Sequence, residues 1–221
     1  PTESNKAGAY SYVPEETGYI GSYVWEDFNQ NGIEDDAVYE ERNDGRKILK
    51  SYNSDINFDG KNDDPGLNGV YVELLNENGL NVNQRHEAVK YLEKENKYVL
   101  VDNVTGDYLY DEFGEHLYTE LKPKTEYTTF DYYGNKGYYL FSNLVPNTYK
   151  LRFTFNDKSE YVMTSLEKNG VKFNVVSRDN GKLVVESEII NVKAFGNNND
   201  IDSIKKYNKN AEFNVGVSRP Y

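Results

Sequence analysis

Short runs of β-branched and aromatic residues alternate along this chain with clusters of Gly, Asn, Asp and Pro. Because successive side chains of a strand point to opposite faces, alternating apolar and polar residues are typical of strands with one buried face. Turn signals such as Asn78-Gly79 and Asn180-Gly181 separate the runs. The pattern predicts strands at residues 19–25, 69–75, 98–102, 107–110, 127–132, 137–142, 148–155, 171–176, 182–190 and 211–217.

One segment, residues 84–94, has a helical pattern instead. It is rich in helix-forming residues, and Ala88, Val89 and Leu92 would share one face of a helix. A helix and an extended segment are both compatible with this composition. Strand patterns dominate the rest of the chain, so we predict the all-β class and, within it, a β-sandwich.

Two loops with the same pattern, D-x-N-x-[DN]-G-x-x-D, lie 28 residues apart. Oxygen atoms at positions 1, 3, 5 and 9, with the carbonyl at position 7, converge in such a loop, and Gly at position 6 permits the sharp turn. Oxygen ligands without Cys or His select calcium over zinc or copper. The predicted ligands of the first loop are Asp27, Asn29, Asn31, Ile33 through its carbonyl, and Asp35. Those of the second loop are Asp55, Asn57, Asp59, Lys61 through its carbonyl, and Asp63.

The charge distribution supports calcium binding at these loops. Residues 26–64 hold 12 Asp or Glu and 5 Lys or Arg, a net charge of −7, whereas the whole chain carries −12. Carboxylates at this density repel one another unless a cation is bound between them. A solvated acidic loop would not explain why Asn and Gly recur at fixed offsets.

Neither loop is an EF-hand, because the segments beside the loops read as strands rather than helices. Position 12, where an EF-hand has a bidentate Glu, is Val38 in the first loop and Gly66 in the second. A remaining ligand must therefore come from elsewhere, and Asp64 is the obvious candidate for the first loop.

Composition excludes several classes of function. The chain has no Cys, so it has neither disulfides nor a thiol nucleophile. Its negative charge argues against nucleic acid as a partner, and no apolar run is long enough for membrane insertion. It also lacks a phosphate-binding glycine loop and a G-x-S-x-G elbow, and we predict that it is not an enzyme. Calcium loops of weak affinity are filled outside cells, which favours a secreted protein.

Histidines and aromatic residues give weaker signals. His86 and His116 stand in polar surroundings, and we expect both at the surface. Aromatic runs such as Tyr108-Leu-Tyr110 are compatible with a platform for sugar or peptide, and also with the alternating core and surface positions of a strand.

Four blocks of the sequence, in order, resemble the B-type repeats of serine–aspartate-repeat surface adhesins, within the collagen-adhesin B-type group. The blocks are Tyr19-Ile-Gly-Ser-Tyr-Val-Trp-Glu-Asp27 with its loop, Asp64-Pro-Gly-Leu-Asn-Gly-Val-Tyr-Val-Glu-Leu74, residues 137–153, and residues 199–217. The resemblance implies a Greek-key, transthyretin-like sandwich in which calcium rigidifies a stalk between adhesive head and cell wall. It also implies that Asp200 and Asp202 belong to a late acidic element of a cation site.

This chain departs from a family repeat mainly by its length. We predict a linker or edge extension at 1–18 and one domain at 19–221, with β-rich insertions at about 37–54 and 80–124. Many domains of the resembled group have a Lys–Asn or Lys–Asp cross-link from first to last strand, but the predicted first strand contains no Lys. We therefore expect bound calcium, rather than a covalent cross-link, to stabilise the domain.

The sequence leaves two functions open. The first is a calcium-stabilised stalk or spacer of a Gram-positive surface adhesin, anchored to the cell wall with neighbouring domains as partners. The second is a ligand-binding module on the same scaffold, with residues 80–133 contacting a host extracellular protein or glycan. A tight, exposed aromatic cluster within those residues would favour the second.

Overall fold

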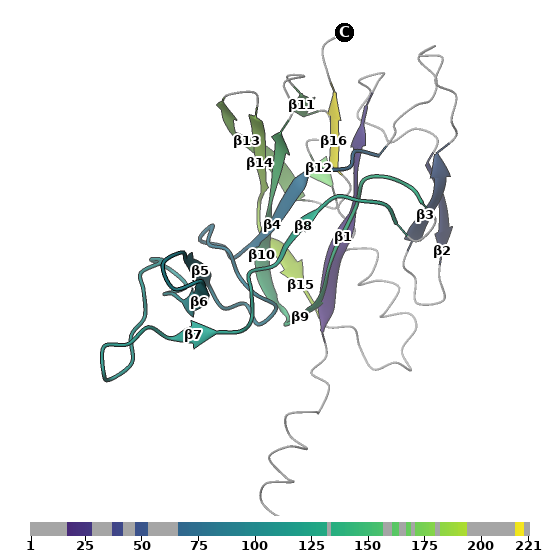
Figure 1. Ribbon diagram of the computed structural model, residues 1–221. Helices are drawn as coiled ribbons and strands as arrows, with labels where there is room; N and C mark the ends of the chain where they lie inside the picture. Colours follow the sequence, from purple (N-terminus) through teal and green to yellow (C-terminus); the bar gives the residue numbers. More distant parts are fainter. Residues whose placement is uncertain are drawn as a thin grey trace, which may run out of the picture.

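The computed structural model describes residues 17–27, 37–41, 47–52, 66–131, 134–156, 161–163, 167–168, 171–179, 182–193 and 215–218. Within these residues every regular element is a strand, as the alternating pattern predicted (Figure 1). The predicted extension at residues 1–18 lies almost wholly outside them. None of the described residues forms a helix that could cross a membrane.

Two sheets form the body of the protein. The smaller sheet has the strand order β11–β16–β1–β9, from Val162–Met163, Val215–Ser218, Gly18–Glu26 and Tyr138–Leu144. The larger has the order β12–β13–β14–β10–β4–β8, with β15 also paired to β10. Its strands are Glu167–Lys168, Val171–Asp179, Lys182–Ser187, Asn147–Asn156, Tyr71–Leu75, Thr125–Tyr127 and Ile190–Val192.

The two sheets pack face to face around one apolar core. Inward-facing residues of β1, β9 and β16 join those of β4, β10 and β14 in a single buried cluster. Tyr139 of β9 and Phe153 of β10 meet across the interface edge to face, with ring centroids 5.5 Å apart. The all-β sandwich predicted from the sequence is confirmed.

The first and last described strands lie side by side. In Figure 1, β1 and β16 point in the same direction, and their parallel register pairs Val24 with Val215 and Glu26 with Val217. Every other strand pair in the two large sheets is antiparallel among the described residues.

Both segments predicted as insertions contain strands. Residues 37–54 hold the hairpin of β2 (Ala37–Glu41) and β3 (Lys47–Tyr52). Residues 80–124 hold a small sheet of β5 (Val89–Leu92), β6 (Lys97–Leu100) and β7 (Tyr118–Thr119), to one side of the sandwich in Figure 1.

The helix considered for residues 84–94 is wrong. Asn83 accepts backbone hydrogen bonds from Arg85 and Glu87 and fixes a turn, in which His86 has φ 61°. The chain then enters β5, which pairs residue by residue with β6. Pairing and burial of Val89 outweigh the local helix preference. The strand predicted at 107–110 is also wrong, since only isolated bridges form there, at Tyr108 and Tyr110.

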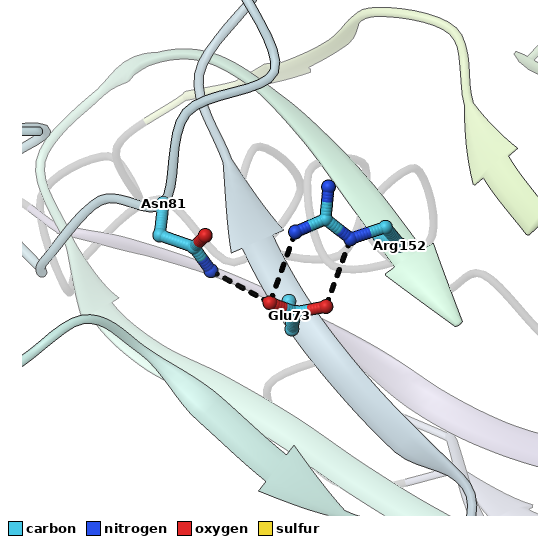
Figure 2. Close-up of polar contacts among 3 residues, drawn as sticks. All are labelled: Glu73, Asn81 and Arg152. Carbon is cyan, nitrogen blue, oxygen red and sulfur yellow. Dashed lines mark hydrogen bonds and ion pairs between the residues drawn. The ribbon is translucent and has the colours of Figure 1, made fainter. Parts of the chain in front are cut away.

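A charged pair links two adjacent inner strands of the larger sheet, β4 and β10. Glu73 of β4 lies directly opposite Arg152 of β10, and the guanidinium donates two hydrogen bonds, of 2.8 and 3.0 Å, to the carboxylate (Figure 2). Asn81 donates a third hydrogen bond to the same carboxylate at 2.9 Å. Burial alone would raise the pKa of Glu73, but the bonds from Arg152 and Asn81 outweigh it and lower that pKa.

Candidate metal centre

The first predicted calcium loop starts at a buried point of the sandwich. Residues Tyr19–Trp25 of β1 run through the core, the strand ends at Glu26, and Asp27 follows it; Glu26 and Asp27 are 2% and 0% exposed. The backbone N–H of Asp27 donates a hydrogen bond of 2.7 Å to the carbonyl of Val217. Strand β16 therefore fixes the position from which the first loop departs.

The second predicted loop leads back to the same point. Gly66 forms an antiparallel bridge with Trp25, and the N–H of Leu67 donates to the carbonyl of Val24 at 2.8 Å. Trp25 and Gly66 therefore lie side by side, although 40 residues separate them in the sequence. The part of the sequence between Asp27 and Gly66, which contains both calcium patterns and the β2–β3 hairpin, is called the excursion below.

Two glycines make this meeting point possible. A Cβ on Gly66 would lie 1.9 Å from the carbonyl oxygen of Lys136, and a Cβ on Gly137 would lie 2.2 Å from that of Val24. Gly137 also has φ 87°, which side chains rarely adopt. Asn68 locks the contact, because its side-chain oxygen accepts a 2.7 Å hydrogen bond from the N–H of Gly137.

Of the predicted ligands, only Asp27 is among the described residues. The others lie outside them: Asn29, Asn31, Ile33, Asp35, Asp55, Asn57, Asp59, Lys61, Asp63, Asp64, Asp200 and Asp202. Within the described part of the chain, no three acidic or histidine side chains gather as metal ligands.

What is described at the site is compatible with a cation. A fully buried carboxylate such as that of Asp27 is costly unless a compensating group lies beside it. Trp25 Nε1 is also buried, and no hydrogen-bond acceptor reaches it within the described residues. The indole N–H only donates, so an oxygen-rich loop is a suitable neighbour for it.

Both histidines expected at the surface are half-buried there and pack against aromatic rings. His86 is half-buried, with Nε2 2.8 Å from the carbonyl oxygen of Thr148 and its ring edge-on to Tyr149. His116 is half-buried against Tyr108 and Tyr110, and its buried Nδ1 has no partner among the described residues. Sequence analysis missed both packing roles because each contact joins residues that no local pattern relates.

Sequence analysis also missed the glycine junction. Gly66 and Gly137 belong to different segments, and only the closed sandwich brings them together. Comparison with protein-family models, curated proteins and solved structures found no match for this chain.

Proposed function

We propose that this protein is a calcium-stabilised structural module, a stalk or spacer in a secreted adhesin attached to a Gram-positive cell wall. The observation that carries the proposal is the excursion between Asp27 and Gly66, which contains both calcium patterns and has both ends tied to the same point of the sandwich. The resemblance to B-type adhesin repeats supports the same role.

The chain provides one set of oxygen ligands for each loop. Asp27, Asn29, Asn31 and Asp35 with the Ile33 carbonyl would hold one ion, and Asp64 would complete it. Asp55, Asn57, Asp59 and Asp63 with the Lys61 carbonyl would hold a second, while Asp200 and Asp202 would contribute from the late acidic segment. Bound calcium would neutralise the crowded carboxylates and cross-link the excursion.

The strand arrangement suits a module that transmits tension. β1 and β16 are adjacent and parallel, so the start of β1 at Gly18 and the end of β16 at Ser218 lie at opposite ends of the strand pair. A pull on those two ends acts along both strands in opposite directions. It loads the hydrogen bonds between them together, whereas a perpendicular pull would break them one by one.

A bound ion at the first loop would reinforce this strand pair. The loop begins at Asp27, whose N–H donates a hydrogen bond to the carbonyl of Val217 in β16. An ion that holds Asp27 in place would therefore also stabilise the end of the β1–β16 pair. In the proposed setting, neighbouring domains of the same surface protein apply the load.

Single-molecule pulling tests this proposal. The full chain is tethered at its two ends and stretched in millimolar calcium and again in excess EGTA. We expect a lower mean unfolding force in EGTA, restored when calcium is returned. Calcium binding measured by calorimetry together with an unfolding force that does not respond to calcium would refute the spacer role, and absence of calcium binding would refute the metal site itself.

A further inference from the structure

The small sheet β5–β6–β7 carries a cavity that the spacer role does not use. Its volume is about 550 Å³, within the range of about 300–1,000 Å³ found for small-molecule sites. It is lined by three tyrosines together with lysine, asparagine, threonine and glutamate side chains. None of the predicted calcium ligands belongs to this sheet.

Strand register places part of the lining in one row. Tyr91 of β5 lies directly opposite Tyr98 of β6, which lies opposite Thr119 of β7. Directly opposed residues share a face of the sheet. The rings of Tyr91 and Tyr98 have centroids 5.0 Å apart at 52°, and Tyr91 stays 44% exposed. The row is an aromatic surface open to solvent.

Local contacts hold the tyrosines in place. The hydroxyl of Tyr91 donates to the side-chain oxygen of Asn96, which ends the β5–β6 turn at φ 52°, a conformation that Asn tolerates. The hydroxyl of Tyr118 donates to Glu95, and this bond raises the pKa of Tyr118 to about 12, so the hydroxyl stays protonated. Rings fixed before binding lose little freedom when a ligand arrives.

Polar groups of both kinds surround the rings. Lys97 Nζ lies 4.9 Å from the ring centroid of Tyr118, and Lys122 Nζ lies 5.9 Å from that of Tyr98. These ammonium groups donate hydrogen bonds and Glu120 accepts them, while Asn96 and Thr119 do both. A purely apolar ligand would desolvate these groups without compensation, at a considerable cost.

A carbohydrate matches this combination. A sugar ring has C–H faces that pack against aromatic rings and hydroxyls that both donate and accept hydrogen bonds. We propose that the cavity on β5–β6–β7 binds a carbohydrate, with a sugar ring against Tyr91 and Tyr98 and its hydroxyls toward Asn96, Thr119 and Glu120. A docked peptide strand fits less well, because β7 is only two residues long.

An array of oligosaccharides tests the proposal on the full chain. The probes are oligomers of galactose and N-acetylglucosamine together with their sialylated and sulfated forms. The array therefore compares neutral with anionic sugars. The strongest probe is then titrated by calorimetry against the parent and variants. We expect Tyr91→Ala to weaken binding at least about tenfold, equivalent to about 1.4 kcal/mol.

Tyr127→Ala is the matched control. Tyr127 of β8 is a tyrosine exposed to 63% that packs on another tyrosine, Tyr71, outside the cavity. Its variant should bind the probe like the parent, and Tyr91→Phe, which keeps the ring, should retain most of the affinity. Circular dichroism of each variant checks that the fold is intact.

Three results would overturn the proposal. They are an array on which no oligosaccharide binds, an equal loss in the Tyr91→Ala and Tyr127→Ala variants, and binding that disappears in EGTA while circular dichroism shows the chain still folded. The last would place the sugar at the excursion between Asp27 and Gly66, since the small sheet contains none of the predicted calcium ligands. A failure here leaves the spacer role intact, because that role depends on the unfolding force and not on sugar.

Discussion

The backbone N–H of Asp27 donates a 2.7 Å hydrogen bond to the carbonyl of Val217, although Asp27 directly follows the first strand and Val217 belongs to the last described one. The carboxylate of Asp27 is buried at the same place. The first predicted loop is therefore coupled to strand pairing and not merely appended to the sandwich.

The first prediction follows from this coupling. Asp27→Asn should remove one calcium ion in a calorimetric titration. A site filled a hundredfold above its Kd contributes about 2.7 kcal/mol. The loss corresponds to a fall in Tm on the order of 5–10 °C in calcium for a chain of this size. In EGTA the difference in Tm between variant and parent should shrink, because neither chain then gains stability from bound calcium.

A charge-matched control accompanies this variant. Glu188→Gln makes the same change of charge at an exposed residue, and should leave both stoichiometry and Tm unchanged. Asp55→Asn should remove the ion of the second loop. Unchanged stoichiometry in both loop variants would contradict the ligand assignment.

The second prediction concerns the junction at which the excursion closes. Gly69→Ala and Gly137→Ala both place a side chain at a positive φ, 82° and 87°. A Cβ at Gly69 meets nothing within 4 Å, whereas one at Gly137 lies 2.2 Å from the carbonyl of Val24. We expect Gly69→Ala to cost about 1 kcal/mol of unfolding free energy and Gly137→Ala roughly 3 kcal/mol or more. Urea denaturation measures both, and equal costs would contradict the close approach.

Local sequence pattern was sufficient to predict some strands of this fold and insufficient for others. Residues 19–25 are a short run rich in β-branched and aromatic residues, so local pattern was sufficient to predict β1. At 84–94 local composition indicated a helix as readily as a strand, and only pairing with Lys97–Leu100 decides for β5. Local patterns also do not specify pairing between distant segments, such as Trp25 with Gly66.

The two candidate sites, the calcium loops and the tyrosine-lined cavity, also differ in how far the sequence alone reveals them. The calcium patterns are contiguous in the sequence, so they are recognisable there, whereas the tyrosines of the small sheet become a site only through strand register. Tyr91 faces Tyr98 because the β5–β6 turn sets that register. A one-residue shift would move one ring to the opposite face.

The third prediction concerns His116. Its Nδ1 is buried and has no partner in the described part of the chain, while its ring packs on Tyr108 and Tyr110 at centroid distances of 5.1 and 4.9 Å. His116→Phe keeps an aromatic ring and removes the unsatisfied nitrogen. We expect it to raise the unfolding free energy by about 1 kcal/mol, measured by urea denaturation. His116→Ala, which also removes the ring contacts, should lower it, and a loss of stability in His116→Phe would mean that the nitrogen is satisfied in solution.

The fourth prediction concerns the pair of Glu73 and Arg152. The pKa of Glu73 is lowered on folding from its usual value of 4.5, because the bonds from Arg152 and Asn81 outweigh burial. A lowered folded pKa means that the pair's stabilisation is present above pH 4.5 and is lost as pH falls through the folded pKa. Glu73→Gln should therefore cost roughly 1–3 kcal/mol at neutral pH, since hydrogen bonds to a charged group are lost and Arg152 stays half-buried without its partner.

The pH dependence of this loss distinguishes the ion pair from simple packing. The difference in unfolding free energy between parent and Glu73→Gln should shrink as pH falls below 4.5, because the parent then protonates the same carboxylate. Arg152→Met and the double variant complete a thermodynamic cycle. We expect the double variant to lose less than the sum of the two single losses, because each single change already breaks the pair. A loss in Glu73→Gln that stays constant across this pH range, with strictly additive single losses, would show that the carboxylate contributes by packing alone.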